Sequence, residues 1–280
     1  MTYLDWFQFA AHRLQTTLPH SSEARLLARR LLDHATGQNH AHLMSPETHL
    51  AGEVEAELNA SLVRLGSGEP LPYVLGFAPF WNRDWQVRSG VLIPRPETEL
   101  LVEAVLEHLT ATKARVAELG TGSGIIAGTL ALERPQWEML ATDVSPEARA
   151  VASDNFSRLG AHVQLLEGLP DNWLAPIKPF APFDCIASNP PYIPSHEIER
   201  LQHSVRDFEP RLALDGGEDG LNPYRQIAAS GRDLLAPGGF VALEVGWDQR
   251  QPIEELFHGW PHLEWKFDFQ NIARTCIVWK

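Results

Sequence analysis

The sequence predicts an α/β protein with a doubly wound, mostly parallel sheet of seven strands, preceded by a small helical bundle and a β-hairpin. Beyond residue 94, short apolar runs alternate with helical stretches, which is the pattern of parallel strands joined by crossover helices. Before residue 76, leucines recur at helical spacing and strand signals are few. Residues 76–93 are rich in aromatic, valine and turn residues, which favours a hairpin. We therefore expect a helical domain over 1–75, a linking hairpin over 76–93 and a larger domain over 94–280.

The helical domain is expected to contain at least two amphipathic helices. One carries apolar residues between charged ones and should end at Gly37, a residue suited to a left-handed helix terminus. The run VEAELNASLVRLGSG predicts another helix that stops at Gly66 and Gly68. The apolar positions of the first helix are Leu26, Leu27, Leu31 and Leu32.

Seven short β-type runs define the sheet of the larger domain. The first five are ARVAEL, EMLAT, HVQLL, FDCIAS and GFVALEVG, and helical stretches separate them. The last two, LEWKFDF and RTCIVWK, are joined by only a few residues, and so short a link permits only antiparallel pairing. We therefore expect one reversed strand near an edge of the sheet.

Composition excludes several classes of protein. The formal charge of −13 argues against broad binding to nucleic acid, which normally needs a basic surface. Two cysteines, Cys185 and Cys276, fit a reducing cytoplasm and are expected to be buried and inert. No signal peptide or membrane-spanning run is evident, and the 12 histidines show no metal-ligand spacing. We expect a cytoplasmic monomer without a metal.

A glycine-rich turn follows the first parallel strand in the run ELGTGSG. Its G-x-G-x-G pattern departs from the dinucleotide fingerprint, because Ile125 stands where that fingerprint continues. Asp143 ends the next strand, where an acidic residue can accept hydrogen bonds from a ribose diol. Glu118, directly before the glycines, would repel a pyrophosphate but suit a cationic amino-acid group. S-adenosylmethionine fits this pattern best; a nicotinamide cofactor and a purely structural turn are the alternatives.

The run SNPPY follows the fourth strand, which adjoins the first in a doubly wound sheet. Two consecutive prolines stiffen the backbone and remove two amide donors. The side-chain oxygen of Asn189 and the carbonyl oxygen of Pro190 can together accept both hydrogens of a planar –NH2 group. Tyr192 can stack on a flat substrate. The sequence therefore predicts methylation of a conjugated nitrogen, such as an adenine amine or a carboxamide.

These motifs resemble known proteins. ELGTGSG, ATD and NPPY resemble the amino-methylating class of S-adenosylmethionine-dependent methyltransferases, whose fold is Rossmann-like. The stretch PLPYVLGFAPFWNRDWQVRSGVLIPRPETELLV and the later run EPRLALDGGEDGLNPYRQI resemble the PrmC/HemK family specifically. The resemblance implies methylation of N5 of the glutamine in the Gly-Gly-Gln loop of peptide chain release factors, with S-adenosylhomocysteine as the second product. It also implies that the N-terminal helices bind the release factor.

The resemblance assigns site residues by motif. It implies cofactor contacts from the acidic position Glu118, where the family commonly has aspartate, from Asp143, and from a tryptophan for which Trp173 is the best match. Asp171 or Asn172 could share that last role. Arg95 and Glu97 are weaker candidates for substrate contact. The glycine loop falls on Gly120, Thr121, Gly122, Ser123 and Gly124, and the catalytic and substrate-binding tetrapeptide on Asn189, Pro190, Pro191 and Tyr192, with Asn189 also expected to contact the cofactor.

Three other functions remain open at this point. An adenine-N6 methyltransferase acting on DNA or RNA would present the same planar –NH2 to the tetrapeptide, although the net charge of −13 disfavours a duplex. A related enzyme class methylates a glutamine of a ribosomal protein. A non-catalytic adaptor is the third alternative, and the intact SNPPY run argues against it.

Overall fold

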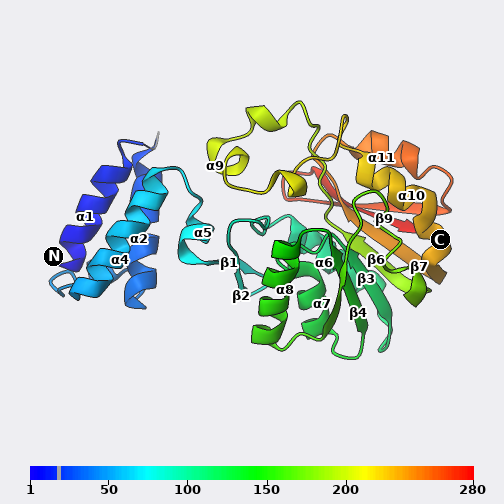
Figure 1. The fold of residues 1–280 in the computed structure, drawn as a ribbon, viewed down its shortest axis with the longest axis horizontal. Helices are drawn as coiled ribbons and strands as arrows, with labels where there is room; N and C mark the ends of the chain where they lie inside the picture. The colour runs from blue at the N-terminus through cyan, green and yellow to red at the C-terminus, as the bar shows by residue number, and fades with distance from the viewer. Residues whose placement is uncertain (18–19) are drawn as a thin grey trace. The chain divides into compact units, whose positions relative to one another are not determined.

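The computed structural model describes residues 1–17 and 20–280. The chain divides into two compact units, one formed by Met1–Gly76 with Gln202–Phe208 and the other by Phe77–Leu201 with Glu209–Lys280 (Figure 1).

The first unit is a bundle of helices, as expected. Asp5 and Thr2 form a capping box at the start of α1, and Gly37 ends α2 in the left-handed conformation with φ of 66°. Trp6 is fully buried in the bundle core, and its indole N–H donates to Oδ1 of Asn59 at 3.1 Å. The helices are α1 (Tyr3–Leu14), α2 (Ser21–Thr36), α3 (Ala41–Met44), α4 (Gly52–Gly66), α5 (Leu71–Leu75) and the short α9 (His203–Arg206).

The second unit contains the seven-stranded sheet, in the order β5-β4-β3-β6-β7-β9-β8. The first five strands of this order are parallel, and β9 is antiparallel to both of its neighbours. The predicted single reversed strand near the edge is therefore confirmed. The strands are β3 (Arg115–Leu119), β4 (Glu138–Asp143), β5 (Val163–Glu167), β6 (Phe183–Ser188), β7 (Leu235–Glu244), β8 (His262–Phe267) and β9 (Ala273–Trp279).

Helices cover both faces of this sheet, and each face has its own apolar core (Figure 1). One core includes residues of α6 (Thr98–His108), α7 (Ile125–Glu133) and α8 (Pro146–Leu159). The other core includes residues of α10 (Asn222–Leu234) and α11 (Arg250–Leu256). Because β3 lies beside β6, the loops that follow these two strands emerge at one point of the sheet edge, where doubly wound sheets bind their ligands.

The hairpin consists of β1 (Phe77–Phe80) and β2 (Arg83–Gln86), paired antiparallel. It packs within the second unit, because the side chain of Trp85 is fully buried in the core beside α7. The backbone N–H of Gln86 donates to Oδ1 of Asn155 in α8 at 2.8 Å. Of the segment 76–93, which the sequence analysis expects to link the two domains, Gly76 is grouped with the first unit and the rest with the sheet.

Candidate active site

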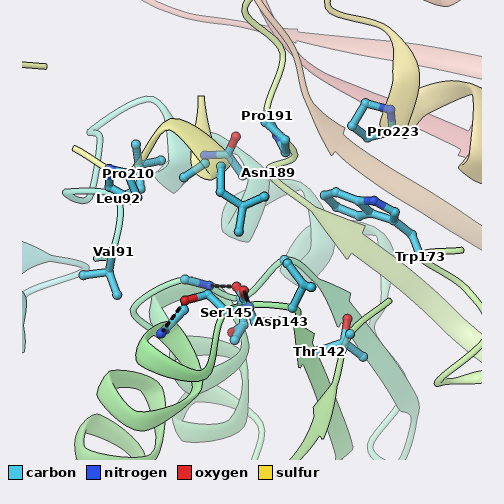
Figure 2. A pocket seen from close by; sticks show the side chains of 18 of the residues that line it. Val91, Leu92, Thr142, Asp143, Ser145, Trp173, Asn189, Pro191, Pro210 and Pro223 are labelled. Atoms are coloured by element: carbon cyan, nitrogen blue, oxygen red, sulfur yellow. Dashed lines mark hydrogen bonds between the residues drawn. The ribbon is translucent and has the colours of Figure 1, made fainter. Parts of the chain in front are cut away.

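A cavity of about 370 Å³ lies in the second unit, at the carboxyl ends of β3, β4 and β6. Figure 2 shows Asn189 and Pro191 above the centre of the view, Asp143 and Ser145 below it, and the indole of Trp173 to the right. The sequence-predicted site residues that line it are Glu118, Gly120, Thr121, Gly122, Ser123, Asp143, Trp173, Asn189 and Pro191. The fold therefore brings together segments that are up to about seventy residues apart in the chain.

The three glycines of the loop have different environments, although all have positive φ, which favours glycine. A Cβ atom on Gly120 would lie 3.3 Å from the indole of Trp173, so this glycine lets the ring come close. A Cβ atom on Gly122 would meet nothing within 4 Å, and this residue borders the cavity. A Cβ atom on Gly124 would lie 2.6 Å from Phe156, and Gly124 does not line the cavity. Gly124 therefore serves the packing of α7 against α8.

Glu118 provides an unpaired acceptor at the cavity. Its side chain is fully buried, and Oε2 accepts hydrogen bonds from Oγ1 of Thr121 at 2.5 Å and from the backbone N–H of Ala127 at 3.0 Å. Oε1 has no hydrogen-bond partner among the described residues. Burial raises the pKa of Glu118 to about 8, and the two hydrogen bonds oppose this shift. A cationic donor entering the cavity would pair with this oxygen and favour the carboxylate form.

Asp143 connects the end of β4 to the glycine loop. Its Oδ2 accepts from the backbone N–H of Gly122 at 2.8 Å, and its Oδ1 accepts from that of Ser145 at 2.9 Å. Burial raises the pKa of Asp143, while these backbone donors act in the opposite direction. Each carboxylate oxygen retains acceptor capacity, so the group can still accept hydrogen bonds from a diol.

Asn189 lines the cavity, and the two polar atoms of its side-chain amide differ in their partners. Nδ2 donates to Oγ1 of Thr98 at 3.2 Å, whereas Oδ1 receives no hydrogen bond from the described residues. Pro190 is buried and does not line the cavity, although no donor in the described ranges pairs with its carbonyl oxygen. The ring of Tyr192 packs against the core on the α10 face and does not line the cavity either. Burial raises the pKa of its phenol.

The segment that contains DGGEDG lies against the backbone that follows Asn189, and Gln249 is hydrogen-bonded to both. The amide of Gln249 donates to the carbonyl oxygens of Tyr192 at 2.9 Å and Gly220 at 3.2 Å. A Cβ atom on Gly216 would lie 2.7 Å from the carbonyl oxygen of Pro191, so glycine permits this close approach. Residues 215–217 line the cavity themselves. This run is therefore part of the site, not only a turn near it.

Sequence reasoning missed several lining residues between the hairpin and α6. Arg95, a weak candidate, lines the cavity, but Glu97 does not. Arg95 pairs with Glu209 at 2.5 Å, and Glu209 also accepts from the backbone N–H of Ile93 at 3.1 Å. The carboxylate of Glu209 is buried, so this ion pair connects two cavity-lining segments. The runs VLIPRPETEL and EPRLAL, which carry the family resemblance and contain Arg95 and Glu209, could have indicated that these segments belong to the site. Near Trp173, Asp171 lines the cavity and Asn172 does not.

Comparison with known proteins identifies the family. Residues 5–76 match a family model described as the PrmC N-terminal domain, and residues 96–212 match one described as the methyltransferase small domain. The release factor glutamine methyltransferase of Koribacter versatilis (strain Ellin345) is 39% identical over 256 residues, which cover 90% of this chain and 90% of that protein. The chain belongs to the release factor glutamine methyltransferase family. The predicted resemblance to PrmC/HemK is thus confirmed.

A further relative agrees with this assignment, and a solved structure shares the fold. The release factor glutamine methyltransferase of Moorella thermoacetica is 42% identical over 236 residues, covering 83% of this chain and 82% of that protein. A crystal structure of a methyltransferase from Pyrococcus furiosus shares the fold, with a TM-score of 0.53, 19% identity and coverage of 82% of this chain and 99% of that one.

Other features of this family member concern chemistry outside the cavity. Cys185 and Cys276 are free and buried, as predicted, and burial raises the pKa of both thiols. Within residues 1–17 and 20–280, no three His, Cys, Asp or Glu side chains are grouped to hold a metal ion. None of the helices in these same ranges is both long and apolar enough to cross a bilayer.

Proposed function

We propose that this protein transfers a methyl group from S-adenosylmethionine to N5 of the glutamine in the Gly-Gly-Gln loop of peptide chain release factors. Its curated relatives bear the name release factor glutamine methyltransferase, and the similarity extends over about nine-tenths of the chain. The observation that carries the proposal is the side chain of Asn189 at the wall of the cavity, whose Oδ1 accepts no hydrogen bond from the described residues.

The residues of the cavity fit S-adenosylmethionine. Oε1 of Glu118 is a buried acceptor without a hydrogen-bond partner among the residues that the structure describes, so an ammonium group can donate to it. We assign Asp143 to the ribose hydroxyls and the indole of Trp173, which closes against Gly120, to the adenine. Gly120, Thr121, Gly122 and Ser123 let the backbone approach the ligand, as described for the loop. When bound, this cofactor supplies an electrophilic methyl group.

Asn189 and Pro190 would orient the substrate amide. Oδ1 of Asn189 accepts one hydrogen of the glutamine –NH2, and the carbonyl oxygen of Pro190 accepts the other. The amide nitrogen is conjugated and weakly nucleophilic, and these two hydrogen bonds strengthen as it becomes pyramidal, which stabilises the transition state over the ground state. Alignment of the nitrogen with the methyl group contributes further. A C–N bond forms, the S–C bond breaks, and the nitrogen then releases one proton to solvent.

Tyr192 has a different role in this arrangement. Because its ring packs against the core, we assign it to holding the tetrapeptide in place instead of stacking on the substrate. Pro191, which lines the cavity, is the better candidate for apolar contact with the glutamine stem.

Labelled S-adenosylmethionine tests the proposal directly. The protein is incubated with a release factor, with a ribosomal protein fraction, or with DNA or RNA, and the labelled atom is located by mass spectrometry. We expect label on the release-factor glutamine alone. Label on an adenine or only on a ribosomal protein would overturn the proposal. Asn189→Ala should reduce kcat at least tenfold with little effect on cofactor affinity. Asn172→Ala, which changes an exposed asparagine that does not line the cavity, is the matched control.

We also propose that the helical unit binds the body of the release factor. A groove on this unit is lined by Phe9, Leu62 and Val63, among other residues, and Phe9 and Val63 are 43% and 62% exposed, so they offer apolar surface to a partner. Val63→Ser should raise KM for the release factor several-fold and leave cofactor affinity unchanged. Leu26→Ser, at an exposed leucine that does not line the groove, is the control. Equal KM values for both variants would contradict this assignment.

A further inference from the structure

A buried threonine determines which atom of Asn189 faces the cavity. Thr98 is fully buried at the first position of α6, 91 residues before Asn189 in the chain. Its Oγ1 accepts the hydrogen bond from Nδ2 of Asn189 at 3.2 Å. We propose that Thr98, together with Glu244, is a positioning residue that holds the Asn189 amide with Oδ1 toward the cavity. The catalytic consequence of this inference rests on the function proposed above.

Glu244 lies next to Asn189 on the neighbouring strand. The register of β6 and β7 pairs Ser188 with Leu243, so the next residue of each strand is Asn189 and Glu244. The carboxyl group of Glu244 is buried, and its Oε2 has no hydrogen-bond partner among the described residues. The nearby hydroxyl of Thr98 lowers the pKa of this carboxyl, against the larger effect of burial. Thr98 is therefore hydrogen-bonded to Asn189 and lies close to the carboxyl group of Glu244.

The chemistry of the hydroxyl gives the hydrogen bond between Thr98 and Asn189 a direction. A threonine hydroxyl has one proton to donate, and a carboxylate can only accept. In the ionised form of Glu244, which predominates above a pH of about 7, the hydroxyl proton of Thr98 goes to the carboxylate. The remaining lone pairs of Oγ1 can then only accept, and the group that can supply a proton is Nδ2 of Asn189. The oxygen of the amide must then point away from Thr98, toward the cavity. A carboxamide has nearly the same shape in its two orientations, so packing alone selects between them poorly.

The wrong orientation would disable the site. An amide rotated by half a turn would present the donor group Nδ2 to the –NH2 of a substrate, which also donates. Two donors facing each other leave no hydrogen bond and expose the substrate nitrogen to repulsion. Loss of the Thr98 hydroxyl would allow this rotation, and it would do so without altering the glycine loop or Glu118, where the cofactor is proposed to bind.

The variant Thr98→Val tests this role, because it removes the hydroxyl while keeping the shape of the side chain. We expect kcat with the release factor to fall about tenfold or more, and the Kd for S-adenosylmethionine to stay within about twofold. Thr98→Ser, which keeps the hydroxyl, should retain most of the kcat of the natural protein. Thr129→Val removes another fully buried hydroxyl, one without a hydrogen-bond partner in the described ranges, and should leave kcat unchanged.

A double-mutant cycle separates positioning from general damage to the fold. In the Asn189→Ala background, Thr98→Val should have no further effect on kcat, because the group that it orients is gone. If Thr98→Val lowers kcat by the same factor in both backgrounds, the proposal is wrong.

A measurement without substrate distinguishes failure of this proposal from failure of the proposed function. The side-chain amide resonances of Asn189 are identified by NMR from their loss in Asn189→Ala. Thr98→Val should shift them and speed their hydrogen exchange, while Thr98→Ser should not. If they respond in this way but the release factor is not methylated, the proposed function fails and the positioning role stands. If Thr98→Val leaves them unchanged, the positioning role is overturned whatever the activity.

Discussion

The carboxylate of Asp143 accepts a hydrogen bond from the backbone N–H of Gly122 at 2.8 Å, so the residue that ends β4 holds the middle glycine of the loop after β3. The same carboxylate also accepts from Ser145 at the start of α8. Asp143 therefore shapes the cavity in addition to its proposed contact with the ribose.

Replacement of Asp143 by alanine should weaken cofactor binding by two routes. It removes the proposed hydrogen bonds to the ribose, and it leaves the N–H of Gly122 without its acceptor. Hydrogen bonds to a charged group contribute about 1.5–3 kcal/mol, so we expect the Kd to rise about 10- to 100-fold. Isothermal titration calorimetry measures this. Asp154→Ala, at an exposed aspartate of α8, should leave the Kd unchanged, and an equal loss in both variants would contradict the role of Asp143.

Cofactor binding should release a proton from Glu118. Burial raises the pKa of this carboxyl to about 8, so it is protonated at pH 7 in the cofactor-free protein, whereas an ammonium group beside Oε1 favours the ionised form. Affinity should therefore increase as pH rises from 6 toward 8, by at most about tenfold per pH unit. Calorimetry in two buffers with different ionisation enthalpies counts the released protons.

Glu118→Gln provides the control for this coupling. The variant retains an oxygen acceptor but has no titratable group, so it should release fewer protons than the natural protein and should bind more weakly at pH 8. Proton release by the cofactor itself is common to both proteins and cancels in the comparison. Equal proton release in the two proteins would show that Glu118 does not change its charge on binding.

Two glycines of the same loop should respond differently to alanine. Both have positive φ, which costs a non-glycine residue about 1–2 kcal/mol. At Gly124 the added methyl group would also meet Phe156 at 2.6 Å, and we expect a total loss of stability of about 2–4 kcal/mol. At Gly122 the methyl group meets no atom within 4 Å but enters the cavity, so the larger effect should be on cofactor affinity.

Chemical denaturation and cofactor titration of both variants check this pair. A greater loss of stability in Gly122→Ala than in Gly124→Ala would contradict the assignment of Gly124 to packing.

Glu244→Gln should stabilise the protein at neutral and alkaline pH. Burial raises the pKa of Glu244 to about 7, so folding favours its protonated form. A raised pKa means that the folded state binds the proton more tightly than the unfolded state. Its contribution to stability is therefore complete below the unfolded pKa of about 4.5 and declines as pH rises to about 7. The glutamine variant lacks this decline.

The difference in unfolding free energy between the natural protein and Glu244→Gln isolates this effect. It should change in favour of the variant by at most about 1.4 kcal/mol per pH unit between pH 4.5 and 7, and level off above that range. Charged and titratable groups around Glu244 are common to both proteins: Arg95, Glu97, Tyr192, Tyr224 and Arg274. A difference that is independent of pH would show that Glu244 does not titrate in this range.

Much of the fold follows from neighbouring residues in the sequence. The parallel strands contain short apolar runs, helical stretches separate them, and the short link before RTCIVWK permits only a reversed strand. The glycine loop, Asp143 and the SNPPY run could be found for the same reason, because each sits at the end of a predicted strand. These patterns depend on local backbone preferences and on the side chains next to them, so they are readable without the tertiary structure.

Only the tertiary structure decided how distant residues meet. It placed the hairpin against α7 through Trp85, paired Arg95 with Glu209, and put Thr98 beside Asn189. It also packed the partly buried ring of Tyr192 against the core on the α10 face. Arg95 and Glu209, like Thr98 and Asn189, are about 90 or more positions apart in the chain. Such contacts depend on the packing of whole elements and on which buried polar groups can satisfy one another, and no local pattern specifies that.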